Sequence, residues 1–310
     1  MNTAASPDEK VMAALAHGSV IMAFVGPIIP VIIWSTQRKK STFVAFHALQ
    51  AMGYQAFTFW LWMIVMILLV PLATLLIPLS MVFMESSNNL GVTPFIFQLV
   101  LFTAIFGLMG IFFLTGIAGA IFCLMGRDFR YPVMGEWLEK YLSYDENVEP
   151  PLDETQEDNW VAGICHATAI LQLWGVVTPL IVWFTQKERS IRLRFQSMQA
   201  FVYQIIAFVI YMLGMAVYMV FFLGMFLILI LGGTRGADNA LQGPGTIILT
   251  VFLVVMFLFW LIVTIVMPIY YLLAGWAGFR VVRGHHFRYP ILGKIIEKRM
   301  ETSQHLEPMP

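Results

Sequence analysis

The chain has 310 residues with 18 basic and 18 acidic side chains, so its formal net charge is zero; hydrophobic residues make up 59% and charged residues only 12%. A soluble globular domain carries about 25% charged residues, and the mean hydropathy here is +0.80. Several apolar runs exceed the roughly 20 residues that cross a bilayer as a helix. These values exclude an ordinary soluble domain and predict an all-α integral membrane protein.

The first half of the chain predicts a broken helix followed by a long two-helix hairpin. Residues 11–34 are apolar, but the sequence Gly26–Pro30 interrupts them, and proline lacks the backbone donor that a helix needs. Two long apolar runs follow at 43–84 and 95–125, separated by the polar turn 85–94. The residues before this half, Met1–Lys10, have no basic start, and we expect no cleaved signal peptide.

The second half repeats this order of segments. Its apolar segments and its glycine-rich loop lie at 160–184, 199–231, 232–245 and 246–279. Pro71 leaves open a split of the run 43–84 into two shorter spans. Because the counterpart 199–231 contains no proline, we expect one helix in each half instead.

An acidic linker joins the halves. Residues 126–159 contain ten acidic side chains, and we expect their Glu149–Asp158 part to be solvated and without packed structure. We therefore predict a first membrane module at 1–143, a linker at 144–159 and a second membrane module at 160–310.

The two halves are homologous. Sliding residues 17–55 by 149 places onto 166–204 gives 14 identities in 39 without a gap. A second shared motif closes each half, as Gly126–Pro132 and Gly284–Pro290, both ending in Phe-Arg-Tyr-Pro, at an offset of 158. We conclude that the chain is a tandem duplication.

Basic residues predict the topology. Sixteen of the 18 lysines and arginines lie at 38–40, 127–140, 187–194 and 280–299. Because short basic loops stay in the cytoplasm, we expect these loops, the linker and the C-terminal tail to be cytoplasmic in the inner (plasma) membrane, with the basic turns on anionic headgroups. Both modules then point the same way, and we expect a pseudo-twofold axis along the membrane normal.

The same rule constrains the first segment of each half. A segment that crossed the membrane once would export one set of basic loops, so we expect it to dip in, turn at Gly26–Pro30 or Gly175–Pro179, and return. Irregular backbone at that depth must be buried against protein or a wet cavity. An ordinary proline-kinked spanning helix is the alternative.

The candidate binding residues gather at the start of the second helix of each half. At 100° per residue, His47, Gln50 and Tyr54 share one helix face. A polar stripe there needs partners: hydrogen bonds to the first segment, or a polar vestibule at the cytoplasmic face. We expect the glutamines to face the module interior. The full set of candidates is His17, Pro30, His47, Gln50, Tyr54, Gln55, His166, Pro179, Gln199, Tyr203 and Gln204.

Catalytic chemistry is not indicated. The runs 43–84, 95–125, 199–231 and 246–279 contain no Asp, Glu, Lys or Arg, whereas ion-coupled carriers usually retain such a residue. Cys123 and Cys165 lie in apolar segments, one per half, and suggest neither a disulfide nor a metal site. We expect no enzyme, catalytic residue, cofactor or metal, and no nucleic-acid partner; other membrane proteins are the expected partners.

These motifs resemble a known domain. Ala16-His17, Pro30 with Trp34, a basic turn ending in Ser41, Phe46-His47 with Gln50-Ala51, and Phe129–Pro132 are similar to a bacterial and archaeal domain of unknown function. That domain is related to the channel subunit of the chloroplast inner-envelope import translocon, the Tic complex. The likeness covers both halves, although Gln196 replaces His47 in the second.

Two functions follow from the sequence. The resemblance implies a non-enzymatic, Tic-like membrane protein that scaffolds or assists a membrane protein complex or protein translocation. The alternative is a passive channel or carrier for a small neutral or lipidic solute, because proline-interrupted segments at matching places in two halves are typical of transporter sites.

Overall fold

The computed structural model describes residues 5–84, 92–145, 151–233 and 244–306, and all regular structure in these ranges is helical. The first module comprises α1 (Pro7–Gly18), η1 (Ser19–Val25), α2 (Ile28–Gln37), α3 (Thr42–Met84), α4 (Val92–Leu124) and α5 (Met134–Leu142). The second comprises α6 (Glu154–Ala167), η2 (Thr168–Val176), α7 (Val177–Gln186), α8 (Ile191–Gly233), α10 (Pro244–Val282) and α11 (Leu292–Leu306).

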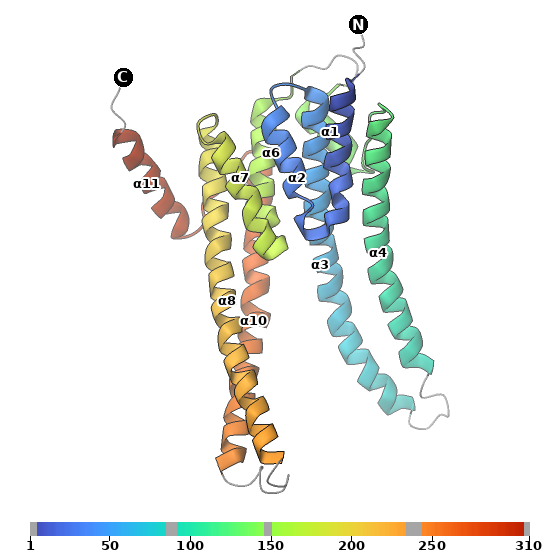
Figure 1. Cartoon of the computed structure of the whole chain (residues 1–310), viewed down its shortest axis with the longest axis vertical. Helices are drawn as coiled ribbons and strands as arrows, with labels where there is room; N and C mark the ends of the chain where they lie inside the picture. Colours follow the sequence, from blue (N-terminus) through green and yellow to red (C-terminus); the bar gives the residue numbers. More distant parts are fainter. Residues whose placement is uncertain (1–4, 85–91, 146–150, 234–243, 307–310) are drawn as a thin grey trace.

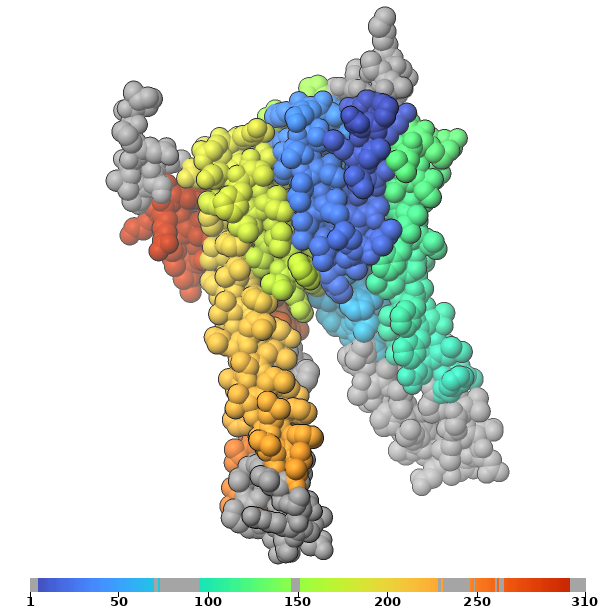
Figure 2. All heavy atoms as spheres, in the orientation of Figure 1, coloured from blue at the N-terminus to red at the C-terminus, as the bar shows by residue number. Residues whose placement is uncertain are grey.

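Two long hairpins, α3–α4 and α8–α10, extend in the same direction from one end of the molecule and diverge from each other (Figures 1 and 2). The parallel orientation of the modules confirms the prediction. Helix α3 is continuous, so the split at Pro71 does not occur. The loops predicted at 85–94 and 232–245 lie largely outside the described residues.

The hairpins present apolar side chains to their surroundings. Ile210, Leu213 and Val220 on α8 are 63%, 63% and 70% exposed, which in water would be unfavourable by about 25 cal/mol per Å² of apolar surface. Five helical segments of the described chain are long and apolar enough to cross a membrane. One of them, Glu154–Gln186, comprises α6, η2 and α7 and reverses direction at Gln172, so it is not a single helix.

The first segment of each module reverses direction, as the re-entrant hypothesis requires. Helix α1 runs away from the end of the molecule that holds the N-terminus, and α2 returns to that end (Figure 1). The reversal occurs at Ala23, where φ is 49° and ψ is −115°, and at the equivalent Gln172, where φ is 52° and ψ is −120°. The turn therefore comes a few residues before the predicted Gly26–Pro30 and Gly175–Pro179.

Gly26 and Pro30 shape the return from this turn. A Cβ atom on Gly26 would lie 2.5 Å from Gln55 Oε1 and 2.7 Å from the Ser19 carbonyl oxygen, so only glycine fits. Pro30 is buried in the first turn of α2, where backbone N–H groups have no helical partner to lose. Pro179 occupies the matching place in α7. Both prolines begin the returning helix.

The acidic linker is shorter than predicted, because its end is helical. Asp153 caps α6 by accepting hydrogen bonds from Thr155 N at 2.9 Å and Gln156 N at 3.1 Å. Acidic residues also favour a helix N-terminus. Residues 154–159, predicted as linker, form the first turns of α6, and Glu157 is only 2% exposed.

The modules share one hydrophobic core, which the insertion of α6 into the first module creates. Trp160 on α6 is 1% exposed and donates from Nε1 to the Leu49 carbonyl at 3.0 Å. Trp60 of α3 donates in the other direction, to the Ala167 carbonyl at 2.8 Å. The apolar cluster around them includes residues of both halves. The chain is therefore not two modules on a flexible tether.

Candidate functional site

The shared Phe-Arg-Tyr-Pro motif is bound by a glutamine of the long helix. Gln50 Nε2 donates to the Phe129 carbonyl at 3.0 Å, and Gln50 Oε1 accepts from the Tyr131 backbone N–H at 2.7 Å. Gly135 permits the approach, since a Cβ there would lie 2.8 Å from Gln50 Oε1. The motif is thus joined to α3 by a two-point amide contact.

Tyr131 lies at the centre of the buried polar cluster beneath this contact. Its hydroxyl is 2.9 Å from His17 Nδ1, and its ring stacks on Tyr54 with centroids 3.8 Å apart. Tyr54 donates to the Phe112 carbonyl at 3.3 Å. A Cβ on Gly119 would be 2.9 Å from the Phe129 ring, so α4 needs glycine there to reach the motif.

Gln55 ties α3 to the broken first segment. Its Nε2 donates to the Ala16 carbonyl at 3.3 Å and to Ser19 Oγ at 2.9 Å. In the second module, Gln204 Nε2 donates to the Cys165 carbonyl at 2.8 Å. These bonds satisfy backbone acceptors where the first segment leaves its α-helical geometry.

The second module repeats the remaining contacts. Gln199 Nε2 donates to the Phe287 carbonyl at 3.2 Å, and Gln199 Oε1 accepts from the Tyr289 backbone N–H at 2.7 Å. The Tyr289 hydroxyl lies 3.1 Å from His166 Nδ1, and the Tyr289 ring stacks on Tyr203 with centroids 4.0 Å apart. The duplicated network holds the broken first segment, the hairpin and the motif together in each half.

The modules differ at one place in this network. In the first, His17 Nε2 is 3.0 Å from His47 Nδ1, and Cys123 Sγ is 3.6 Å from the same atom. In the second, His166 Nε2 contacts Gln196 Oε1 at 2.9 Å. His17, His47 and Cys123 are fully buried, and their three ligand atoms lie within 4.8 Å of one another.

A carboxylate, Asp128, also distinguishes the first module from the second. Asp128 Oδ1 is 2.9 Å from His47 Nε2, although His47 Nε2 makes no aligned hydrogen bond among the described residues. Asp128 also pairs with Arg130, which bonds Glu139 from Nε at 2.9 Å. Burial favours the neutral acid, but His47 and Arg130 outweigh it and hold the pKa of Asp128 well below its usual range.

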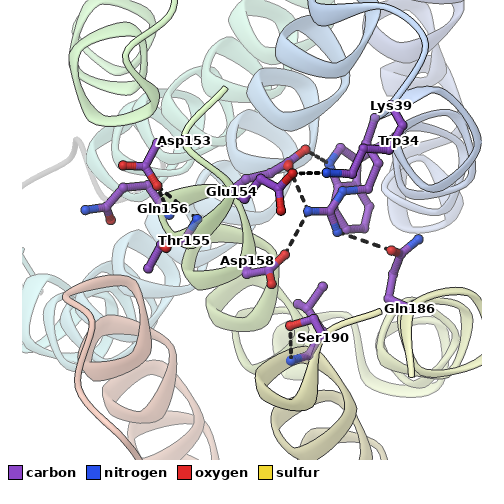
Figure 3. Close-up of polar contacts among 12 residues, drawn as sticks. Trp34, Lys39, Asp153, Glu154, Thr155, Gln156, Asp158, Gln186 and Ser190 are labelled. Carbon is purple, nitrogen blue, oxygen red and sulfur yellow. Dashed lines mark hydrogen bonds and ion pairs between the residues drawn. The ribbon is translucent and has the colours of Figure 1, made fainter. Parts of the chain in front are cut away.

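A second polar cluster lies where the modules meet. Arg38, whose side chain is 4% exposed, donates from Nη2 to Glu157 at 2.8 Å and to Asp158 at 2.9 Å. Trp34 Nε1 donates to Glu157 at 2.6 Å. Arg38 Nη1 donates to Gln186 Oε1 at 3.2 Å, so Trp34, Asp158 and Gln186 surround its guanidinium (Figure 3). Arg38 therefore points into the protein, whereas Lys39 and Lys40 of the same turn are exposed.

This cluster is not reciprocal between the modules. By the repeat offset, Trp183 and Lys187 correspond to Trp34 and Arg38, while Asp8 and Glu9 correspond to Glu157 and Asp158. Lys187 instead lies 3.9 Å from Glu188, and Glu9 takes part in the capping box of α1. The contacts of this cluster are therefore made in one direction only, although the equivalent helices α2 and α7 also pack against each other.

The structure brings most predicted site residues together, and it places Pro30 and Pro179 in the first turn of the returning helices. His17, His47, Gln50, Tyr54 and Gln55 form one cluster, and the four glutamines of the two stripes are 0–2% exposed, as expected. Sequence reasoning missed Cys123, Asp128 and Tyr131 as their neighbours. A signal was present: Cys123 and Asp128 correspond to Val281 and His286 at the offset of 158, so they vary where the scaffold is kept.

Comparison with known families decides the relationship. The model of a magnetosome magnetite crystal formation protein family, MamF/MmsF, matches residues 8–138 and again residues 157–296. The chain belongs to the MamF/MmsF family. Each half is one copy of the MamF/MmsF unit, which confirms the tandem duplication. No curated protein and no solved structure matches the chain.

Membership of the MamF/MmsF family supports a bacterial membrane accessory protein, in agreement with the apolar helices. Both family matches contain the histidine of the first segment, the glutamines of the long helix and the Phe-Arg-Tyr-Pro motif. The buried network described above is therefore the internal structure of the MamF/MmsF unit. A relation of this chain to the Tic channel subunit rests on the sequence resemblance alone.

Proposed function

We propose that the chain is a non-enzymatic scaffold that holds partner membrane proteins in the membrane where magnetite crystals form. The observation that carries this proposal is the fusion of two family units into one body by α6 and the buried Arg38 cluster. Such a body presents two divergent hairpins at a defined spacing. A role in protein translocation, which the Tic resemblance implies, would be one form of this function.

The polar stripes support a scaffold over a passage for solutes. Gln50, Gln55, Gln199 and Gln204 donate from Nε2 to backbone carbonyls of their own module. The pocket beside the chain reversal in the second module, between Gln172 and Tyr271, has a volume of about 50 Å³. That space suits a few waters and not a lipidic solute, so it gives no support to a lipid-carrier site at this reversal.

Helix α4 offers a surface that a partner helix could approach. Cβ atoms on Gly107 and Gly110 would meet nothing within 4 Å, and small residues allow close packing of membrane helices. By contrast, Gly116 packs against Val20 and Gly119 packs against Phe129. Only the part of this glycine row away from the polar cluster is free in the described chain.

Co-purification tests the proposal. Full-length chain expressed in a magnetite-forming bacterium and extracted in mild detergent should retain partner proteins at a stoichiometric ratio. The double variant Gly107→Leu with Gly110→Leu should lose them and remain folded. Gly224→Leu is the matched control, since a Cβ there also meets nothing within 4 Å but lies on α8. A parent that purifies alone, while transporting solute in liposomes, would favour the carrier.

We also propose that the end of the molecule with the basic turns faces the cytoplasm. Lys40 and Arg189 are exposed at that end in the two modules, and both native cysteines are buried. Lys40→Cys and Arg189→Cys should each react with a membrane-permeant maleimide and resist an impermeant one applied outside intact cells. Labelling of the two positions from opposite sides would contradict the proposal.

A further inference from the structure

We propose that the first module contains a binding site for a divalent transition-metal ion of the zinc class, formed by His17 Nε2, His47 Nδ1 and Cys123 Sγ. The sequence alone gives no expectation of a metal here, because the three ligands come from α1, α3 and α4. The site goes beyond the proposed scaffold function and does not depend on it.

Two separations between the ligand atoms fit one ion, and all three atoms lie within 4.8 Å of one another. Tetrahedral zinc, with bonds of about 2.0 Å to nitrogen and 2.3 Å to sulfur, places two nitrogens about 3.3 Å apart and nitrogen and sulfur about 3.6 Å apart. The observed separations are 3.0 Å for His17 Nε2 to His47 Nδ1 and 3.6 Å for His47 Nδ1 to Cys123 Sγ. Two imidazoles and a thiolate suit zinc and cobalt better than magnesium or calcium.

The surroundings also match those of a metal site. A metal-bound imidazole usually directs its other nitrogen to a carboxylate or another polar partner. Here His47 Nε2 faces Asp128 at 2.9 Å, and His17 Nδ1 faces the Tyr131 hydroxyl at 2.9 Å. Asp128 Oδ2 is buried and has no hydrogen-bond partner in the described part of the chain, so this oxygen can accept a further hydrogen bond.

Charge and protons balance when an ion binds. Without an ion, Asp128 favours the proton on His47 Nε2, so His47 Nδ1 accepts from His17 Nε2–H. When a divalent cation enters, the Cys123 thiol proton leaves to solvent and the His17 proton moves to Nδ1, facing Tyr131. The charges of the cation, the thiolate, Asp128, Arg130 and Glu139 then sum to zero, since Arg130 pairs with both carboxylates.

The second module is an internal comparison. It has the same histidine, tyrosine and motif, but Gln196, Val281 and His286 replace His47, Cys123 and Asp128. The hydrogen-bonded scaffold forms there without these three residues. Building the module therefore does not require them, which separates the ligand set from the structural role of the cluster.

Cobalt titration of the full chain in detergent tests the site. We expect one Co²⁺ per chain, with ligand-field bands of a tetrahedral ion and a thiolate-to-cobalt charge-transfer band, both removed by one equivalent of Zn²⁺. Cys165→Ala is the matched control, because Cys165 is also buried but lies in the module that lacks the set; it should bind Co²⁺ like the parent.

Variants copied from the second module should abolish the site without disturbing the scaffold. Cys123→Val should remove the charge-transfer band, and His47→Gln should weaken Co²⁺ binding at least about 100-fold. Asp128→Asn should weaken binding by about 10- to 100-fold while leaving the stoichiometry at one. Size-exclusion profiles identify any variant that fails to fold.

Introducing the three residues of the first module into the second module tests the site even if the variants above do not fold. Gln196→His with Val281→Cys and His286→Asp should give the second module a site and raise the stoichiometry to two. The assignment is overturned if the parent shows no thiolate band, if folded Cys123→Val keeps it, if Cys165→Ala loses it, or if the folded triple variant still binds one ion.

Discussion

Removal of Arg38 should destabilise the whole chain far more than removal of its repeat counterpart. Arg38 is the partner of two carboxylates, Glu157 at 2.8 Å and Asp158 at 2.9 Å, and the side chains of Arg38 and Glu157 are 4% and 3% exposed. Arg38→Ala leaves Glu157 buried without a cation. Breaking a buried ion pair from one side costs about 3–5 kcal/mol, and we expect a loss in this range.

The matched control is Lys187→Ala. Lys187 occupies the equivalent position, but its side chain is 36% exposed and its distance to Glu188 is 3.9 Å. Exposed pairs contribute about 0–1 kcal/mol. The free energy of unfolding of both variants should be measured by denaturant titration in the same detergent. Adding Glu157→Gln to Arg38→Ala should recover part of the loss, because it removes the unpaired buried charge.

Two results would refute this reasoning. Equal small losses for Arg38→Ala and Lys187→Ala would mean that the buried network does not hold the modules together. A double variant that is no more stable than Arg38→Ala would mean that the unpaired charge of Glu157 is not the cause of the loss. The first result would also remove the structural basis of the scaffold proposal.

Three further predictions concern the fold. Gln50→Leu combined with Gln199→Leu leaves motif backbone groups without partners, at about 1–3 kcal/mol each, and should reduce the monodisperse fraction in size-exclusion chromatography; unchanged elution would contradict the two-point amide contact. Trp160→Ala should lower the unfolding free energy by about 3–5 kcal/mol, whereas Val11→Ala at the equivalent position, 47% exposed, should change it by less than about 1 kcal/mol; similar losses would argue against the shared core. Gly26→Ala should destabilise by about 1–3 kcal/mol through overpacking, while Gly107→Ala on open helix surface should be neutral or stabilising; a neutral Gly26→Ala would contradict the close turn.

Much of the fold could be predicted because it depends on local patterns. The lengths of the apolar runs predict the hairpins, and the positions of the lysines and arginines predict their common direction. The reversal of the first segment follows from the same charges. Its location does not: Ala23 and Gln172 adopt positive φ angles of 49° and 52°, a conformation that neither residue type favours. Tertiary contacts impose it, and no residue signal marks it.

The candidate site could be predicted only in part. The helical spacing of Gln50, Tyr54 and Gln55 predicts their shared face, and burial of unpaired amides is unfavourable enough to predict that they point inward. Their partners are backbone groups of Phe129 and Tyr131 about 80 residues away, and such pairing is set by three-dimensional packing. The helical end of the linker was missed for another reason: its acidic composition masked the capping role of Asp153.

The non-reciprocal contact between the modules has a consequence for the origin of the duplication. An interface in which each subunit uses a different surface is heterologous, and unless its rotation closes a ring it generates an open series. The contacts of Arg38 and Trp160 are therefore not those of a symmetric dimer joined into one polypeptide. A single unit that used the surfaces around Trp34 and Trp160 on copies of itself would form a ring or an open series, depending on that rotation. The duplicated chain makes this contact once. In the first module the position equivalent to Trp160 is Val11, so the tryptophan that a further unit would need for the same contact is absent there.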